Sequence, residues 1–396
     1  MATRRKICLM TGTRAEYGLL YWLMRELAAD DRVDFQLVVS AMHLAPEFGE
    51  TIKEIRADGF KIDAETPCLA GGDDNAALGK SMGQAVIGFV DAFDQLSPDL
   101  LILLGDRFEC LAAASAATAL RIPIGHLHGG ETSEGAMDEA FRHAITKMSH
   151  LHFVAAPEYA RRVVQLGEQP ERVFNVGALG LENFLRLEIP DRAILSRNLG
   201  LDLATAPYFL LTYHPATLVR RDPVQALEQV LSALSAFPDF KIVATKANAD
   251  PGGRAINGRL ATFARENPGR VHLADSLGQA RYLGVLRGAA AVIGNSSSGI
   301  IEAPAVDVPI INIGSRQNGR LKAKSVLDCD EQRDAITAAI ARALRPEFRT
   351  GLPPPPYGRP RPVAERIAAV LRETNLSGLL VKKFYDLPVE DFSDGR

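Results

Sequence analysis

Short apolar runs alternate with longer amphipathic segments along the first part of the chain. The short runs predict β-strands at residues 6–10, 35–40, 100–104, 124–127 and 152–155. Apolar residues recur at helical spacing between them, over 19–29, 48–58, 77–96, 109–120 and 138–148. Strands that are apolar on both sides and alternate with helices indicate a parallel sheet that is covered on both faces.

A second series of the same kind follows an interruption of the pattern at 176–190. Its strands are predicted at 209–213, 241–245, 271–273, 291–294 and 310–313, again with helical patterns between them. The chain therefore predicts an α/β protein with two doubly wound, Rossmann-like domains in series. We expect the first domain to span residues 1–180 and the second to span 181–362.

The C-terminal part of the chain has a different composition. The segment 351–362 is rich in proline and predicts a stiff connector without regular structure. A helical pattern follows at 363–372. We expect the connector to return residues 363–396 to the first domain.

Length, charge and cysteine usage narrow the class of protein. A chain of 396 residues suits two domains. A net charge of -3 disfavours nucleic-acid binding, which normally requires a basic face. The four cysteines are scattered, without zinc spacing, as is usual for reduced residues of a cytoplasmic protein. The apolar run after the basic start is too short for a signal peptide, and no segment is long enough to span a membrane.

Most predicted strands end in a glycine or small residue followed by ionisable or hydroxyl side chains. Examples are Asp106 and Arg107 after the third strand, His128 and Glu131 after the fourth, and His214 in the second half. Ligands of open parallel sheets bind beyond the carboxyl ends of the strands. The sequence therefore predicts a ligand cleft lined by these loops.

The segment 291–302 combines an apolar strand, a Gly-Asn-Ser-Ser-Ser-Gly loop and the start of a helix. Free N–H groups and the helix dipole at such a start suit a diphosphate, and hydroxyls such as those of Ser296 and Ser297 add donors. Glu302, one turn into the helix, is a candidate acceptor for ribose hydroxyls. The alternative is an ordinary serine N-cap with a glutamate near the favourable end of the helix. The chain has neither a GxGxxG nor a Walker A sequence, which counts against NAD and ATP.

Three arginines follow strand ends that contain glycine, and arginine can neutralise a diphosphate through charge-assisted hydrogen bonds. They are Arg14, Arg107 and Arg316. The common alternative for each of them is a surface salt bridge.

Five side chains are candidates for acid–base chemistry: Asp106, His128, Glu131, Asp138 and His214. Simpler interpretations exist for three of them. Asp106 could pair with the adjacent Arg107, Asp138 could cap the helix that follows it, and a lone histidine such as His214 is more often structural.

Several segments together resemble the hydrolysing UDP-N-acetylglucosamine 2-epimerases. The segments are TGTRAEYG (11–18), LLGDRFE (103–109), HLHGGE (126–131), DEAFRHAITKMSHLHF (138–153), RVVQLGE (162–168), YHPAT (213–217), GNSSSGIIEAP (294–304) and INIGSRQNGR (311–320). The similarity covers almost the whole chain, including KFYDLP (383–388), and is strongest to the branch of bacterial sialic acid synthesis. A sister branch, which acts on UDP-diacetylbacillosamine for legionaminic acid, carries nearly identical motifs.

The resemblance implies the GT-B architecture, in which two Rossmann-like domains enclose the active site. It also implies release of UDP and inversion at carbon 2, which would yield free N-acetylmannosamine from UDP-N-acetylglucosamine. Substrate-contacting positions of the family match Arg14, Arg107, His214, Asn248, Ser296, Ser297, Glu302 and Arg316, and positions implicated in catalysis match Asp106, Asp138 and His214.

Two positions depart from the family pattern. Many relatives have a glutamate where this chain has His128, which leaves open the identity of the group that moves the carbon-2 proton. Gly18 replaces a serine that contacts the nucleotide in some relatives.

A hydrogen on carbon 2 becomes acidic only once UDP departs and positive charge develops at carbon 1. We therefore expect elimination to a glycal followed by addition of water, with Asp106 and Asp138 sharing the proton transfers and His128 or Glu131 assisting. His214 would bind or protonate the phosphate. This chemistry calls for no cofactor and no metal ion, and the expected partner is the UDP-sugar alone.

Three other functions remain open at this stage: a GT-B glycosyltransferase, a non-catalytic sensor of UDP-sugars and a non-hydrolysing epimerase. The choice between N-acetylglucosamine and diacetylbacillosamine is also open. Relatives in the family imply a homodimer or a homotetramer.

Overall fold

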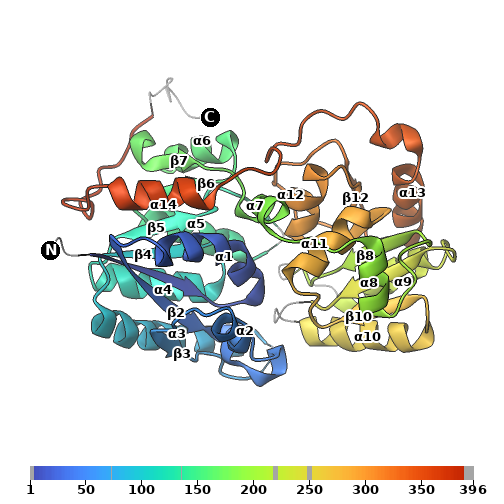
Figure 1. Ribbon diagram of the computed structural model, residues 1–396, viewed down its shortest axis with the longest axis horizontal. Coiled ribbons are helices and arrows are strands. Elements are labelled where there is room, and N and C mark those ends of the chain that lie inside the picture. Colours follow the sequence, from blue (N-terminus) through green and yellow to red (C-terminus); the bar gives the residue numbers. More distant parts are fainter. Residues whose placement is uncertain (1–3, 73, 135, 217–221, 248–251, 388–396) are drawn as a thin grey trace, which may run out of the picture.

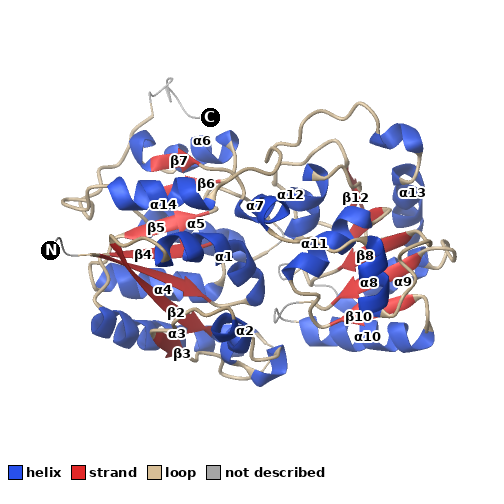
Figure 2. Ribbon diagram, viewed as in Figure 1, coloured by secondary structure: helices blue, strands red, loops and turns tan. Residues whose placement is uncertain are grey.

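Two parallel β-sheets, each flanked by helices, lie side by side (Figure 1). This computed structural model describes residues 4–72, 74–134, 136–216, 222–247 and 252–387. Figure 2 shows helices on both sides of the strands in each half. The two Rossmann-like domains and the GT-B arrangement expected from the sequence are confirmed.

The first sheet has the strand order β3-β2-β1-β4-β5-β6-β7, with every pair parallel. Its strands are β1 (Arg5–Thr11), β2 (Val33–Ser40), β3 (Ala64–Thr66), β4 (Leu100–Leu104), β5 (Ile124–Leu127), β6 (Leu151–Val154) and β7 (Val173–Asn175). The helices along this part of the chain are α1 (Arg14–Ala28), α2 (Ile52–Ala57), α3 (Asn75–Leu96), α4 (Phe108–Ala119), α5 (Asp138–Met148), α6 (Pro157–Gln165) and α7 (Leu179–Arg186). Short 3-10 turns lie at Ala41–Leu44, Pro46–Phe48 and Pro170–Arg172.

The second sheet has the order β10-β9-β8-β11-β12-β13, again parallel throughout. Its strands are β8 (Tyr208–Thr212), β9 (Lys241–Thr245), β10 (Val271–Ala274), β11 (Ala291–Gly294), β12 (Ile310–Ile313) and β13 (Val326–Cys329). The helices along this part of the chain are α8 (Arg192–Leu199), α9 (Pro223–Leu234), α10 (Gly253–Glu266), α11 (Gln279–Gly288), α12 (Ser297–Ala305) and α13 (Arg333–Ala343), with a 3-10 turn at Pro346–Arg349. The last helix of the chain, α14 (Ala364–Glu373), follows them.

The apolar character of the strands follows from burial on both faces. In β1, Ile7 and Leu9 point into the core beneath α1 and α14, whereas Cys8 and Met10 point into the core beneath α3 and α4. Successive side chains of a strand face opposite sides of the sheet, so a strand between two helical layers must be apolar at every position. This is why the central strands could be predicted from apolar runs.

Ten predicted strands are present, with ends that differ by at most a few residues. Three strands were not predicted: β3, β7 and β13, which all lie at sheet edges and are partly exposed. The predicted helix at 48–58 is shorter, because Pro46–Phe48 forms a 3-10 turn and α2 begins at Ile52. The interruption at 176–190 contains a helix, α7, which contacts both α1 and α12.

Helix α14 lies on the first domain, beside α1 (Figure 1). Its apolar residues Ile367 and Leu371 are completely buried in the core that α1 also covers. The buried carboxylate of Glu182, in α7, accepts hydrogen bonds from the N–H groups of Val363 and Ala364 at 2.9 and 2.7 Å. It thereby satisfies N–H groups at the helix start that otherwise have no partner. The exact boundary at residue 180 stays a prediction.

The proline-rich connector has no helix or strand between Arg349 and Ala364. Tyr357 within it is nevertheless buried, and its hydroxyl hydrogen-bonds to that of Tyr159 in α6 at 2.6 Å. Among the described helices, none is long and apolar enough to cross a membrane.

Candidate active site

The first sheet reverses its strand order between β1 and β4, which is where doubly wound sheets bind ligands. The loop after β1 begins α1 with a capping box: Thr13 accepts from the N–H of Glu16, and Glu16 accepts from Gly12 and Thr13. Burial and the neighbouring Glu109 raise the pKa of Glu16 to about 8. The loop after β4 carries Asp106 and Arg107.

Asp106 forms an ion pair with Arg142, a fully buried arginine of α5. The same guanidinium donates to the carbonyl oxygen of Glu131 at 3.2 Å, to Glu139 at 2.5 Å and to the hydroxyl of Ser133 at 2.9 Å. Arg142 therefore fixes Asp106 relative to the loop that follows β5.

Arg107 donates from Nε to Oε1 of Glu109 at 3.0 Å. Glu109 is completely buried, and its other oxygen has no hydrogen-bond partner among the described residues. From the sequence we considered an ion pair between Asp106 and the adjacent Arg107. In the structure Asp106 pairs instead with the distant Arg142.

His128 has a positive φ of 63°, which is uncommon for a residue with a side chain. Its Nε2 accepts the N–H of Leu179 at 3.3 Å, so Nδ1 carries the proton that is shared with Glu131 Oε1 at 2.7 Å. Both ring nitrogens are thereby engaged. The imidazole connects the loop after β5 to the start of α7.

Glu131 is 2% exposed and also pairs with Arg320, which comes from the second domain. Burial acts to raise the pKa of Glu131, but Arg320 and His128 outweigh it and hold the pKa at about 2. The N–H of Glu134 also donates to the carbonyl oxygen of Asn318 at 3.3 Å. A buried ion pair thus joins the two domains beside Asp106.

Asp138 is the first residue of α5, and the capping position belongs to Met137. Asp138 therefore does not cap this helix, contrary to the simpler interpretation. On the same helix, Glu139 pairs with Arg142 and with His143. Burial is outweighed by these partners and by the N–H of Ser133, so the pKa of Glu139 falls to about 2.

In the second domain, Asn295 organises the ends of β8 and β11. Its side-chain oxygen accepts the N–H of His214 at 2.7 Å, and its side-chain nitrogen donates to the carbonyl oxygen of the same residue at 2.8 Å. Gly294, just before it, has a φ of 134°, and a Cβ there would collide with the backbone oxygen of Thr212. Only glycine allows β11 and β8 to approach in this way.

Ser296 and Ser297 stand at the start of α12, and the Ser296 side chain makes no capping hydrogen bond. The N–H groups of a first helical turn suit an anion, and these two serines stand beside them. Ser298 instead donates to Glu302 and accepts from the hydroxyl of Tyr282 at 2.6 Å.

Glu302 is buried, and burial raises its pKa to about 7 despite the hydrogen bond from Ser298. A Cβ on Gly180 of the first domain would collide with its carboxylate. Glu302 therefore lies where α12 meets α7, at the contact between the domains.

The three candidate arginines have different positions. Arg14 reaches across to the carbonyl oxygen of Asp275 in the second domain at 3.1 Å. Arg316 donates to the carbonyl oxygen of Asn295 at 3.0 Å, next to the serine loop. Arg107 extends into an interdomain pocket. Asn248, which we expected at the site, lies outside the described residues.

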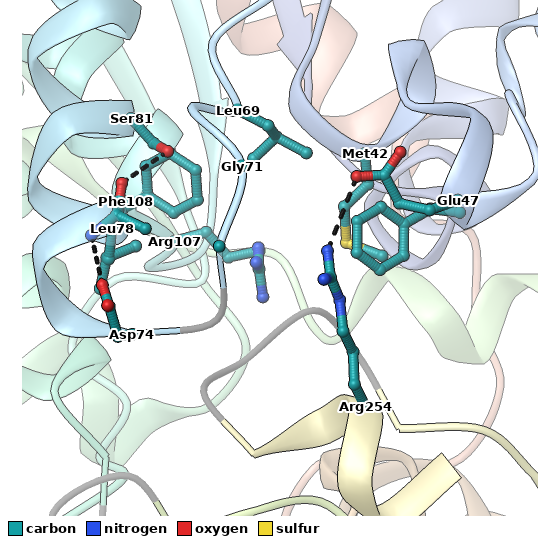
Figure 3. A pocket seen from close by; sticks show the side chains of 13 residues that line it. Met42, Glu47, Leu69, Gly71, Asp74, Leu78, Ser81, Arg107, Phe108 and Arg254 are labelled. Carbon is teal, nitrogen blue, oxygen red and sulfur yellow. Dashed lines mark hydrogen bonds and ion pairs between the residues drawn. The ribbon is translucent and has the colours of Figure 1, made fainter. Parts of the chain in front are cut away.

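This pocket is lined by the turns after β2, the loop after β3, the starts of α3 and α4, and one residue of α10. Figure 3 shows the Arg107 side chain between Phe108 on one side and Met42 and Arg254 on the other. Arg254 belongs to the second domain and lies 3.8 Å from Glu47.

Arg142, Asn295 and Arg320 organise the site but were not singled out from the sequence. Arg142 follows Glu139 by three residues in a predicted helix, and that spacing favours an ion pair. The partners of the other two are 81 and 189 residues away, and no local pattern indicates them. In the described part of the chain, no three His, Cys, Asp or Glu side chains gather so as to hold a metal ion.

The chain is similar to known proteins over most of its length. A family model described as UDP-N-acetylglucosamine 2-epimerase matches residues 25–372. Over 387 residues the chain is 39% identical to a GDP/UDP-N,N'-diacetylbacillosamine 2-epimerase (hydrolyzing) of Campylobacter jejuni, covering 97% of this chain and 100% of the relative. Over 340 residues it is 36% identical to a UDP-N,N'-diacetylbacillosamine 2-epimerase (hydrolyzing) of Legionella pneumophila, covering 86% and 89%.

The fold has counterparts among solved structures. The UDP-GlcNAc 2-epimerase of Neisseria meningitidis, solved with UDP-GlcNAc bound, superimposes with a TM-score of 0.76 over 93% of this chain and 100% of that one. The sequences are 16% identical, so this likeness concerns the fold.

Proposed function

The chain belongs to the hydrolysing UDP-N-acetylglucosamine 2-epimerase family, and we propose that its substrate within this family is UDP-N,N'-diacetylbacillosamine. It is an enzyme, a hydrolysing UDP-sugar 2-epimerase. The sequence alone favoured UDP-N-acetylglucosamine, with the diacetylated sugar as the alternative. The relatives that are 39% and 36% identical support the alternative.

One observation carries the catalytic proposal: the buried Glu131–Arg320 ion pair brings the Asp106 network of the first domain against the nucleotide loops of the second. Hydrolysis with inversion at carbon 2 needs both halves. One half must stabilise a leaving diphosphate, and the other must move protons at the sugar.

The first step is departure of UDP. The bond between carbon 1 and the diphosphate oxygen breaks, and the electron pair leaves with UDP. We assign the stabilisation of the leaving diphosphate to the start of α12 with Ser296 and Ser297, to Arg316 and to His214. Arg14 approaches from the first domain.

The second step is loss of the carbon-2 proton, which forms the carbon 1–carbon 2 double bond of a glycal. Water then adds its hydroxyl to carbon 1, and a proton reaches carbon 2 from the opposite face. We assign these transfers to Asp106 and Asp138, since Arg142 of α5 holds one of them and the same helix begins with the other.

His128 and Glu131 fit a positioning role better than proton transfer. Both nitrogens of His128 are engaged, and the low pKa of Glu131 keeps it ionised in its ion pair with Arg320. A group with a pKa of about 2 is a poor general base near neutral pH.

The test is incubation of the purified protein in D2O with UDP-N,N'-diacetylbacillosamine and, separately, with UDP-N-acetylglucosamine. Phosphorus and proton NMR should detect free UDP together with the manno-configured free sugar, which should carry deuterium at carbon 2. The diacetylated substrate should have the higher kcat/KM. A higher value for UDP-N-acetylglucosamine would refute the substrate proposal, and a product that retains UDP would refute hydrolysis.

The same experiment separates the other candidate functions. A glycosyltransferase would release little free sugar without an acceptor, and a sensor would bind UDP without turnover. A cytoplasmic location and a homodimeric or homotetrameric assembly stay predictions.

A further inference from the structure

The pocket that contains Arg107 lies on the opposite side of the β1–β4 crevice from the Asp106 network. Its lining comes from the turns after β2, the loop after β3, the starts of α3 and α4, and one residue of α10. Asp106 is held instead from the β5 side, by Arg142 and the loop 128–134. Since β2 and β5 lie on opposite sides of the β1–β4 pair, the pocket and the Asp106 network flank the crevice.

A pyranose ring in this crevice would present opposite edges to the two sides. Carbons 4 and 5 lie across the ring from carbons 1 and 2, which react. With the reacting edge toward Asp106, the far edge faces the pocket. We propose that this pocket is the specificity subsite that receives the 4-acetamido group and the carbon-6 methyl group of the sugar, an inference that rests on the proposed function.

The lining of the pocket suits these two groups. Its apolar side chains are Met42, Phe48, Leu69, Leu78 and Phe108. Methyl groups of the acetamido substituent and of carbon 6 gain by contact with such a surface. N-acetylglucosamine would place hydroxyls at carbons 4 and 6 in the same space, and these would not gain the apolar contact that the methyl groups make.

Arg107 adds a directional element. Its side chain extends into the pocket between Phe108 and Met42 (Figure 3), and its Nε is held by the buried Glu109. A guanidinium fixed in this way can donate to the carbonyl oxygen of the 4-acetamido group. The lining also includes the polar side chains of Glu47, Asp74, Ser81 and Arg254. The subsite thus combines an apolar wall with polar groups, among which we assign Arg107 as the donor to the acetamido group.

The experiment fills the pocket and compares two substrates. Ala77 lines the pocket in the first turn of α3, whereas its neighbour Ala76 is exposed and does not. In Ala77→Phe, kcat/KM for UDP-N,N'-diacetylbacillosamine should fall at least about 10-fold further than kcat/KM for UDP-N-acetylglucosamine, which is the scale of discrimination by one group in a pocket. Ala76→Phe should change the ratio of the two values less than about 2-fold.

A second variant keeps the volume and changes the polarity. Met42→Gln should lower the ratio of kcat/KM for UDP-N,N'-diacetylbacillosamine to kcat/KM for UDP-N-acetylglucosamine severalfold. The UDP dissociation constant should not change. If Ala77→Phe does not fold, this variant decides alone. Equal losses for both substrates, or no loss, in the folded variants would overturn the subsite.

The two proposals fail in different measurements. Wild-type preference for UDP-N-acetylglucosamine overturns the substrate proposal. The subsite is judged by the change in the substrate ratio between variant and wild type, which can be measured whichever substrate the wild type prefers.

Discussion

The two domains line the site with different kinds of groups. The first-domain loops carry paired charges: Asp106 with Arg142, and Glu131 with His128 and the incoming Arg320. In the second domain, the loops after β8 and β11 are shaped by backbone geometry and neutral side chains, since Asn295 holds the backbone of His214 with two hydrogen bonds. Fixed charges suit proton transfer, whereas oriented N–H groups suit an anion that arrives and leaves.

A short segment of the second domain connects these two environments. Arg316 and Gln317 donate to the carbonyl oxygen of Asn295 at 3.0 and 2.8 Å, and Arg320 follows a few residues later to pair with Glu131. The loops that would hold UDP are therefore fixed to the loop that surrounds Asp106.

The largest expected effect concerns the chemistry of the first domain. Asp106→Asn should lower kcat by roughly 100- to 10,000-fold, the scale of a general acid–base group. Steady-state kinetics with the UDP-sugar measure kcat. Asp91→Asn, on an exposed position of α3, serves as the control and should retain activity. Full turnover by Asp106→Asn would remove this aspartate from the mechanism.

The second largest effect is expected at the Glu131–Arg320 ion pair, which joins the two domains. Arg320→Met leaves the buried Glu131 without its main partner and should cost about 3–5 kcal/mol. At roughly 2–4 °C per kcal/mol for domains of this size, thermal unfolding should shift down by about 10 °C. Arg359→Met removes an ion pair with Asp307 whose side chains are 53% and 61% exposed, and should cost under about 1 kcal/mol.

The double variant Glu131→Gln, Arg320→Met sharpens this test. It should recover at least half of the lost stability, because no uncompensated carboxylate remains. Additive losses in the double variant would show that the ion pair does not carry the link.

Glu302 is a buried carboxyl group of α12 in the second domain, beside the neutral hydroxyl of Ser298. Burial raises its pKa from 4.5 to about 7, so the folded protein binds a proton that the unfolded chain has lost. Its contribution to stability is therefore present below about pH 4.5 and is lost as the pH rises through 7. The free energy of unfolding of Glu302→Gln should match that of wild type near pH 5 and exceed it by about 2 kcal/mol at pH 8.

Thermal unfolding across pH 5–8 checks this sign. The difference between variant and wild type isolates Glu302, since Glu16, whose pKa is also raised, is present in both. A constant difference over this range would mean that Glu302 is ionised throughout, and the contrast between the domains would weaken.

The smallest expected effect concerns the shape of the loops to which we assign nucleotide binding. Asn295→Ala removes two hydrogen bonds to His214, each worth about 1 kcal/mol net, and should raise the UDP dissociation constant about 10-fold. Calorimetric titration with UDP measures it. Asn267→Ala, which removes a bond to Phe263 at the end of α10, should leave UDP binding unchanged.

The central strands and the positions of the loops could be predicted from the sequence, because double-sided burial makes such strands apolar throughout. The edge strands β3, β7 and β13 were not predicted, since their few, partly exposed residues show no clear pattern. The fourth edge strand, β10, was predicted from its apolar residues Val271 and Leu273.

The candidate site, too, could be predicted from the sequence only in part. Its residues follow the strands at which they were expected, since every parallel strand ends at the same edge of its sheet. Their partners could not be predicted: Asp106 is paired by a residue 36 positions later, and the N–H that engages His128 lies 51 positions later. Such pairs depend on the packing of helices over the sheet and leave no local signal.

The division of roles between the domains is tested most directly by UDP binding to two variants. Calorimetric titration should give Asp106→Asn a UDP dissociation constant within about 2-fold of wild type, although its turnover is lost. The double variant Ser296→Ala, Ser297→Ala should bind UDP at least about 10-fold more weakly. The opposite result, loss of UDP binding in Asp106→Asn and retention in the serine variant, would contradict the assignment of chemistry to the first domain and of nucleotide binding to the second.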